Sequence, residues 1–234
     1  MGRYDYLRSG DASTVTAIGK KIVAFQNTYF IHLMETFSEA SPIQALEIGL
    51  GQGFFAEACR ARSIDYTAIE ANPLTARELS ARGFKVCSEE VPPISISARF
   101  DVIFMNQVFE HVKHVDAASA LIDTCCAHLK DKGLLIISSP DFLRWKEDFY
   151  HDYSHSYPTT LTRFSQLFFD HGLQLMYRNW YSSFLRGFWL TGAAAFLSRM
   201  CHRLGIFRVM FPEKAYKVHC SLLPSVIVVG QKIR

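Results

Sequence analysis

A glycine-rich segment, ALEIGLGQGFF at residues 45–55, constrains this chain more than any other part of it. It begins as an apolar run that ends in the acid Glu47, continues with Gly49, Gly51 and Gly53, and leads into a segment of helical composition. The pattern predicts a strand, a tight turn and a helix. Glycine is used where the backbone comes close to a ligand, and the first N–H groups of the helix lie beside that approach. We therefore expect a cofactor on this turn.

The glycine spacing indicates which kind of cofactor to expect. A dinucleotide fingerprint, G-x-G-x-x-G, has its third glycine one residue later, where this chain has Phe54. The pattern E-x-G-x-G-x-G instead resembles motif I of class I S-adenosylmethionine-dependent methyltransferases. The resemblance implies a Rossmann-like α/β sheet, mostly parallel with its last strand antiparallel, and S-adenosylmethionine as cofactor.

Three later segments resemble the successive motifs of this family in order and spacing. Residues 66–69 form an apolar run ending at Glu70, residues 100–105 (FDVIFM) read as a buried strand followed by NQVFEHV, and residues 130–141 read as a turn and another strand. Strands that alternate with helices in this way give a sheet covered on both faces. The resemblance covers about residues 43–172.

The resemblance also implies a set of cofactor-binding residues. Glu70 is expected to accept hydrogen bonds from both ribose hydroxyls, which suits an ionised carboxylate. Ser88 and Glu89 stand where the family contacts adenine. Glu89 is equally expected to be a solvated acid in a loop. The complete expected set is Glu47, Gly49, Gly51, Gly53, Glu70, Ala71, Ser88, Glu89, Asn106 and Gln107.

Length and composition favour one elaborated domain. The chain has 234 residues, of which 49% are hydrophobic, so it can bury a sizeable core. We expect residues 13–38 to form an N-terminal helical cover, residues 43–181 and 222–234 the core, and residues 182–221 a helical insertion before the last strand. Six cysteines without a C-x-x-C pair indicate neither zinc nor disulfides. With no signal peptide and no membrane span, a cytoplasmic protein is expected.

Three histidines are the candidates for catalysis. His111 follows Glu110 in a family-like E-H-V, after a strand whose end should border the ligand, and is the first choice as general base. His151 and His155 lie in an aromatic loop at 142–158. The alternative is that these histidines bind backbone groups or line an acceptor pocket.

A metal-dependent mechanism is weighed separately. Ubiquinone-biosynthesis O-methyltransferases and small-RNA 2′-O-methyltransferases, which resemble this stretch, take metal ligands from E-x-x-E-H and a later histidine. Here Gln107 replaces the first acid. Glu110, His111 and one of His151, Asp152 or His155 still offer ligands, but one charged ligand is missing. We expect no metal.

The insertion is apolar with interleaved arginines. From Arg178 to Lys217 there are seven Lys or Arg residues against one acid, although the whole chain carries only +3. Residues 184–211 are interpreted as a lid, a homodimer face or a surface helix that touches anionic lipid. We expect its aromatic residues to be buried against the acceptor pocket or a symmetric partner, with the arginines facing an anionic acceptor group or solvent; these aromatic residues are Phe184, Phe188, Trp189, Phe196 and Phe207.

Taken together, these observations predict an enzyme that methylates a hydroxyl of a small molecule. The first candidate acceptor is a glycosyl or lipid-linked compound such as a surface-glycan precursor. The alternatives are a nucleic-acid or protein methyltransferase, a nicotinamide-dependent oxidoreductase and a non-catalytic cofactor-binding module. The small net charge argues against nucleic acid.

Overall fold

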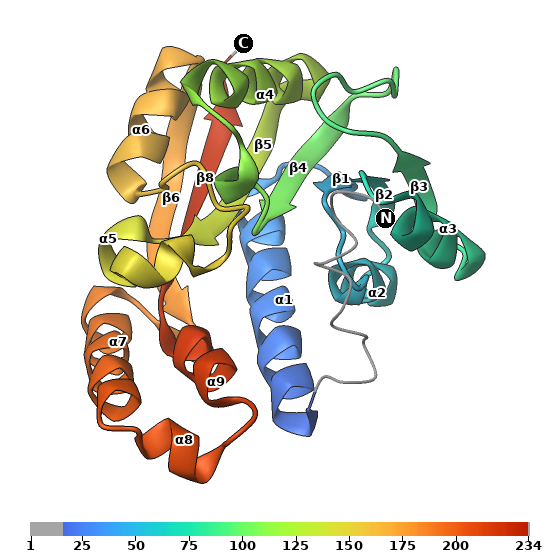
Figure 1. The fold of residues 1–234 in the computed structure, drawn as a ribbon. Coiled ribbons are helices and arrows are strands. Elements are labelled where there is room, and N and C mark those ends of the chain that lie inside the picture. The colour runs from blue at the N-terminus through green and yellow to red at the C-terminus, as the bar shows by residue number, and fades with distance from the viewer. Residues whose placement is uncertain (1–15, 234) are drawn as a thin grey trace.

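A single eight-stranded sheet forms the centre of the computed structural model, which describes residues 16–233 (Figure 1). The strand order is β3-β2-β1-β4-β5-β8-β6-β7. The strands are β1 (Gln44–Ile48), β2 (Asp65–Glu70), β3 (Lys85–Ser88), β4 (Phe100–Asn106), β5 (Leu129–Pro140), β6 (Leu173–Ser182), β7 (Leu185–Arg186) and β8 (Ser225–Lys232).

Helices follow most of the strands, as the alternating pattern predicts. They are α1 (Ala17–Phe37), α2 (Phe54–Ala61), α3 (Pro73–Ala81), η3 (Phe109–His111), α4 (Val115–His128), α5 (Phe142–Trp145), η4 (Lys146–His151), α6 (Leu161–Asp170), α7 (Phe188–Arg203), α8 (Ile206–Met210) and α9 (Ala215–Leu222). Asn72 caps α3 because its side chain accepts hydrogen bonds from the N–H groups of Leu74 and Thr75, at 2.9 and 3.2 Å, and Pro73 suits the first turn.

The strand directions confirm the predicted sheet. Strands β3, β2, β1, β4 and β5 are parallel neighbours, whereas β8 is antiparallel to both β5 and β6. Strand β6 therefore runs in the same direction as β5. This places the C-terminal ends of β1, β2, β4 and β6 at one edge of the sheet, where open α/β sheets hold their ligands.

Two apolar layers cover the two faces of the sheet. On one face α1 and α2 pack against the strands, with the rings of Phe30 and Phe55 lying 5.2 and 4.4 Å from that of Phe104. On the other face α4 and α6 bury side chains such as Ile122 and Phe164. Helix α1 was predicted to begin near residue 13, but residues 13–15 lie outside the described part.

The insertion differs from the prediction in what it buries. Of its five aromatic residues only Phe207 is buried, at 9% exposure, while Phe184, Phe188, Phe196 and Trp189 are 48, 47, 64 and 83% exposed. Within one chain these four residues are therefore not buried, while their burial against a symmetric partner stays a prediction. The reason is that α7 turns small and polar residues, Thr191, Ala195 and Ser198, toward the rest of the molecule.

The insertion packs against α5 and η4 through polar contacts. Ser198 Oγ lies 2.7 Å from His219 Nδ1 on α9, and His219 Nε2 lies 3.1 Å from Asp148 Oδ2 of η4. Arg144 Nη1 of α5 donates to the carbonyl of Phe188 at 3.1 Å. These contacts hold α7 and α9 beside the loop that follows β5.

Candidate functional site

A cavity of about 750 Å³ opens at the ends of β1, β2 and β4. Its volume lies within the usual range for small-molecule and cofactor sites. All its lining residues belong to 48–121, so neither α1 nor the insertion borders it. Among the residues predicted to bind the cofactor, those that line it are Gly49, Gly51, Glu70, Ala71, Glu89 and Gln107.

The glycine turn forms one wall of the cavity with bare backbone. At Gly51, φ is 51° and a Cβ would meet no atom within 4 Å, so this residue presents open backbone to a ligand. At Gly49, φ is 77° and a Cβ would come within 2.5 Å of Val108 Cγ2. The two glycines therefore serve different needs: Gly51 leaves room for a ligand, and Gly49 lets the loop after β4 pack closely.

Glu70 stands at the end of β2 with its carboxyl group at the cavity wall. Its Oε1 accepts a hydrogen bond from the N–H of Asn72 at 2.8 Å. Burial raises the pKa of this carboxyl group, and the backbone N–H groups of Asn72, Gly51 and Leu50 partly oppose the rise by stabilising the ionised form. The acid is thus held in place beside the glycine turn, where it can accept further hydrogen bonds from a ligand.

Glu47 lies beneath the turn and away from the cavity lining. Its carboxyl group is buried and accepts a short hydrogen bond from the hydroxyl of Tyr66 on β2. Burial raises the pKa of Glu47 to about 8, against the lowering effect of the Tyr66 hydrogen bond. In this arrangement the acid links β1 to β2 and does not face the cavity.

Three other predicted cofactor residues also lie off the cavity lining. Gly53 approaches Leu79, whose Cδ2 would be 2.6 Å from an added Cβ. Ser88 is exposed at the end of β3, next to Glu89, which does line the cavity. Asn106 ends β4, and its Oδ1 accepts a 3.4 Å hydrogen bond from the hydroxyl of Tyr181.

Gln107 has a strained backbone at the cavity wall. Its φ is 57°, in the left-handed region that side chains other than glycine seldom adopt, and such positions concentrate at functional sites. The Gln107 N–H donates to the carbonyl of Ser138 at 2.9 Å, and the side-chain amide donates to Ser225 Oγ at 3.1 Å. These two bonds hold the strained residue in place.

His111 lines the cavity and has a defined tautomer. Ser154 Oγ donates to Asp152 Oδ1 at 2.6 Å, so toward His111 Nδ1, 3.0 Å away, it can only accept. The carbonyl of Ser154, at 3.3 Å from the same nitrogen, is also an acceptor. Nδ1 of the neutral ring must therefore carry the proton, and Nε2 is the basic nitrogen.

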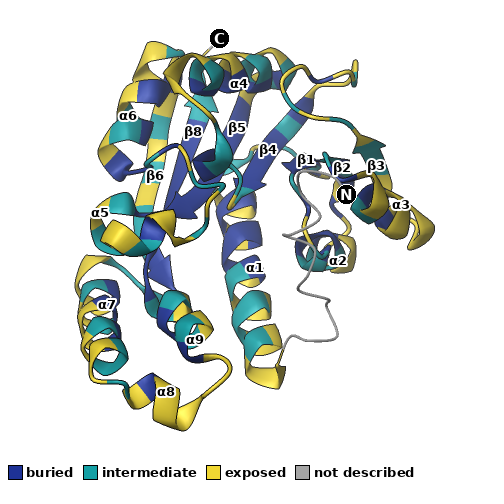
Figure 2. Cartoon of the chain, in the orientation of Figure 1, coloured by how far each residue is buried: buried dark blue, intermediate teal, exposed yellow. Residues whose placement is uncertain are grey.

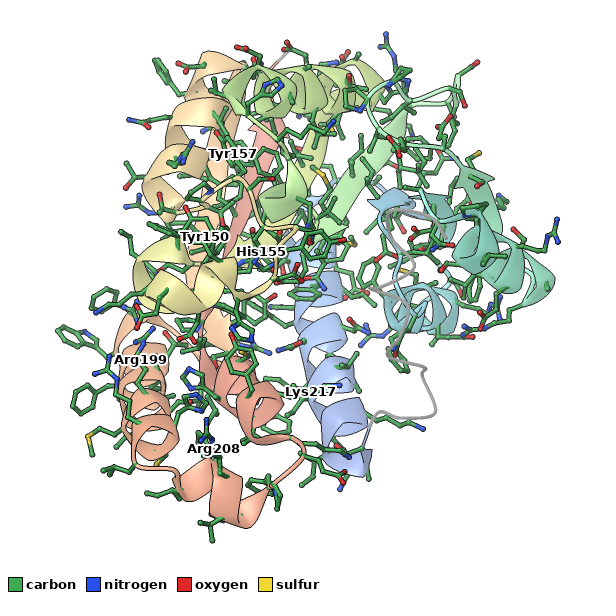
Figure 3. The ribbon with its side chains drawn as sticks, in the orientation of Figure 1. Tyr150, His155, Tyr157, Arg199, Arg208 and Lys217 are labelled. Atoms are coloured by element: carbon green, nitrogen blue, oxygen red, sulfur yellow. The ribbon has the colours of Figure 1, made fainter. Side chains whose placement is uncertain are left out.

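The structure brings His155, and not His151, next to His111. The rings of His111 and His155 meet edge-on with centroids 5.0 Å apart. His155 Nδ1 lies 2.8 Å from the carbonyl of Phe149, and burial lowers the pKa of this histidine, which favours the neutral ring. His151 is exposed and its ring packs 4.1 Å from that of Tyr216 in the insertion. In Figure 3, His155 lies near the strand ends, well above Arg208 in the insertion.

Comparison with known proteins decides the family. Residues 23–201 match the family described as a methyltransferase domain, which is more than half of the chain. The chain belongs to this methyltransferase family. The match confirms the class I S-adenosylmethionine-dependent methyltransferase predicted from the glycine turn and favours it over the nicotinamide oxidoreductase.

Solved structures show the same fold at low sequence identity. The N-methyltransferase NodS from Bradyrhizobium japonicum WM9 aligns with TM-score 0.61 and 13% identity over 92% of this chain and 98% of that one; it has also been solved with S-adenosyl-L-homocysteine. The cyclopropane synthase MmaA2 from Mycobacterium tuberculosis aligns with TM-score 0.60 and 14% identity, over 88% of this chain and 84% of that one. No curated protein matches the sequence. No helix within residues 16–233 is long and apolar enough to cross a bilayer.

Glu110 lies close to His111 and His155, and the three residues form a group of potential metal ligands. Ligand atoms of Glu110, His111 and His155 lie within 4.8 Å of one another. Glu110 is buried; its Oε2 accepts from Ser139 Oγ at 2.9 Å, while Oε1 has no partner among the described residues. Gln107, which replaces the first acid of the E-x-x-E-H pattern, donates its side-chain amide to Ser225 and does not join this group.

Sequence reasoning missed several residues of the site. Asn72, Arg82, Lys113 and His114 line the cavity, and of these only Asn72 carried a signal, as the cap of α3. Ser154 fixes the tautomer of His111 from a loop that shows no periodicity. Nothing in the sequence indicates that this serine meets that histidine.

Proposed function

We propose that this methyltransferase transfers a methyl group from S-adenosylmethionine to a hydroxyl of a small-molecule acceptor, with His111 as general base. The observation that carries the proposal is the His111 tautomer at the cavity wall, because it leaves Nε2 able to take a proton. A hydroxyl must lose its proton on methylation, so it needs such a base more than an amine does.

The cavity fits the cofactor. Its volume, the open backbone at Gly51 and the carboxyl group of Glu70 together suit a ligand with a ribose and a flexible polar chain. Glu70 would hold the ribose hydroxyls and Gly49 and Gly51 the adjoining chain, while Glu89 lies toward the adenine side. The bound cofactor supplies an activated methyl group on a positively charged sulfur.

The chain's own residues then position the acceptor and remove its proton. His111 accepts the proton at Nε2 while Nδ1–H donates to Ser154. Burial raises the pKa of Asp152, but the hydrogen bonds from Ser154 and the electrostatic effect of the nearby His155 and His111 outweigh it, so the net pKa is lowered. An ionised Asp152 behind Ser154 stabilises the imidazolium that forms, because negative charge close to it favours the protonated ring.

A glycosyl hydroxyl, as in a surface-glycan precursor, is the proposed acceptor class. It is supported by the loop at 146–157, which places the exposed rings of Tyr150 and Tyr153 in the segment that also carries His155. Nucleic-acid and protein acceptors are set aside because they need an extended recognition surface.

The test is methyl transfer from labelled S-adenosylmethionine into small-molecule fractions, including nucleotide sugars. We expect label in a glycosyl fraction with the wild type and a loss of about 10²-fold or more with His111→Asn, the usual range for a general base. His151→Asn, which alters an exposed histidine away from the cavity, is the matched control and should stay active. Label at an amine, or full activity of His111→Asn, would contradict the proposal.

A metal-assisted mechanism is the second candidate, favoured by one observation. The buried Oε1 of Glu110 has no partner in the described part of the chain, and a carboxylate oxygen of this residue lies within 4.8 Å of ring nitrogens of His111 and His155. A divalent cation there would neutralise that carboxylate and hold the acceptor oxygen. We nevertheless place the metal-free mechanism first, because Gln107 contributes no charge to this group.

A further inference from the structure

The insertion exposes many large apolar side chains at one end of the molecule. Helices α7 and α8 lie there without lining the cavity, and Figure 2 shows much of both in the colour of exposed residues. We call this surface the α7–α8 face; its exposed apolar members are Trp189, Leu190, Phe196, Leu197, Met200, Leu204, Ile206, Val209, Met210 and Phe211. Soluble chains seldom expose large apolar patches without a partner.

Helix α7 is amphipathic, but it exposes its apolar side and buries its polar side. Trp189, Phe196 and Met200 recur at helical spacing on its exposed side, whereas Thr191 and Ser198 are buried on the opposite side. Core packing in this chain therefore does not use the apolar side of α7. The 16 residues of the helix are also too few to span a bilayer, which requires roughly 20.

The charges around this face have one sign. Arg203, Arg208, Lys214 and Lys217 are exposed along and beside it, and Glu213 is the only acid between residues 182 and 222. Arg203 has one partner outside the insertion, Glu147, at 3.8 Å. The remaining basic groups give the face a positive rim. Each Lys or Arg held near an anionic membrane surface strengthens partitioning onto that membrane by about fivefold.

We propose that the α7–α8 face docks this protein onto an anionic phospholipid bilayer. An apolar strip bordered by basic residues, with a tryptophan at one end, is the composition of helices that lie in the headgroup layer. A second copy of the chain fits the face less well. A two-fold contact would bring the strip onto itself and set the same cations against one another, and within residues 182–222 Glu213 is the only acid that could balance them.

Docking through this face sets which edge of the sheet lies toward the bilayer. The insertion leaves the sheet after β6, at the same edge where β1, β2 and β4 end and the cavity opens. A bilayer bound by α7 and α8 therefore lies on the ligand side of the sheet. This inference does not depend on the proposed acceptor, since it concerns where the protein sits rather than what it methylates.

The test is co-sedimentation of the full chain with vesicles of phosphatidylcholine alone or mixed equally with phosphatidylglycerol. Wild type should bind the mixed vesicles, and the triple variant Trp189→Gln, Phe196→Gln, Met200→Gln should bind at least tenfold more weakly. The matched control is Phe169→Gln on α6, whose ring is as exposed as Trp189, at 83%, but lies outside the α7–α8 face; it should bind as wild type. S-adenosylhomocysteine binding by each variant verifies its fold.

Two further readouts make the outcome decisive. Trp189 emission should shift to shorter wavelength on the mixed vesicles and the shift should vanish in Trp189→Phe, while Arg208→Gln with Lys214→Gln should lower the preference for phosphatidylglycerol by about 25-fold. Failure of wild type to bind the mixed vesicles, or equal binding by the triple variant, overturns the proposal. The proposal is also overturned if the wild type is a dimer and the triple variant is a monomer, because the face would then be a self-interface.

Discussion

The ring of His155 lies edge-on to the ring of His111, with the centroids 5.0 Å apart, although the two residues come from η3 and from the loop after η4. Glu110 joins them to form the one set of three close potential metal ligands found within residues 16–233. Whether this group handles a proton or a cation is the main chemical question about the site. Chelation separates the two.

We predict that methyl transfer survives EDTA. His111 is already oriented by Ser154, and the Gln107 amide bonds to Ser225 instead of joining the three ligands. The measurement is initial rate with and without EDTA, followed by addition of Mg²⁺ or Mn²⁺, with His155→Ala as the variant that removes a ligand. Loss of turnover in EDTA that either ion restores would assign Glu110, His111 and His155 to a metal.

Glu70→Ala should weaken the cofactor without unfolding the protein. The residue ends a strand at the cavity wall, and it is expected to make charge-assisted hydrogen bonds worth roughly 1.5 to 3 kcal/mol in total. Calorimetric titration with S-adenosylhomocysteine measures the change. Glu70→Gln, which keeps the shape and loses the charge, should fall between the wild type and the alanine variant. Unchanged affinity in Glu70→Ala would remove this residue from the ribose site.

Glu47 should make stability fall as pH rises. Burial raises the pKa of Glu47 from 4.5 to about 8, so between these values the folded chain keeps a proton that the unfolded chain has lost. The free energy of unfolding then decreases by up to roughly 1.4 kcal/mol per pH unit in that window. Glu47→Gln lacks this slope. Denaturant unfolding of both ligand-free proteins from pH 5 to 8 checks it, and parallel profiles would contradict the raised pKa.

Ser198→Ala should loosen the insertion. It removes the hydroxyl that lies 2.7 Å from His219 Nδ1 in a buried position and leaves that nitrogen without its partner, at a cost of about 1 to 3 kcal/mol. We expect lower unfolding stability, faster proteolysis within 182–221 and unchanged S-adenosylhomocysteine affinity. Ser165→Ala, which removes a hydroxyl that bonds only to its own helix, is the control. Equal stability of the two variants would show that the Ser198 contact is not an anchor.

Much of the sheet could be predicted because its signals are local. The apolar runs before Gly49 and at 100–105 form β1 and β4, and Asn72 with Pro73 starts α3. The glycine turn could also be predicted, since only glycine readily adopts the positive φ values found at Gly49 and Gly51. The roles of these residues toward a ligand stay predictions.

The placement of side chains from distant segments could not be predicted. His151 and His155 are equivalent as sequence, yet packing of the 142–158 loop puts His155 against His111 and His151 against Tyr216. The aromatic residues of the insertion were expected to be buried because they are apolar, but α7 buries its small side and exposes Trp189.

The sequence by itself thus determined the order of strands and helices, the glycine turn and the methyltransferase family, because short-range spacing and backbone preference encode them. Tertiary structure alone decided which histidine meets His111, which serine fixes its tautomer and which side of α7 faces water. Those outcomes depend on contacts between segments far apart in the chain. Such contacts are set by the shape and polarity of both partners, and no local pattern records them.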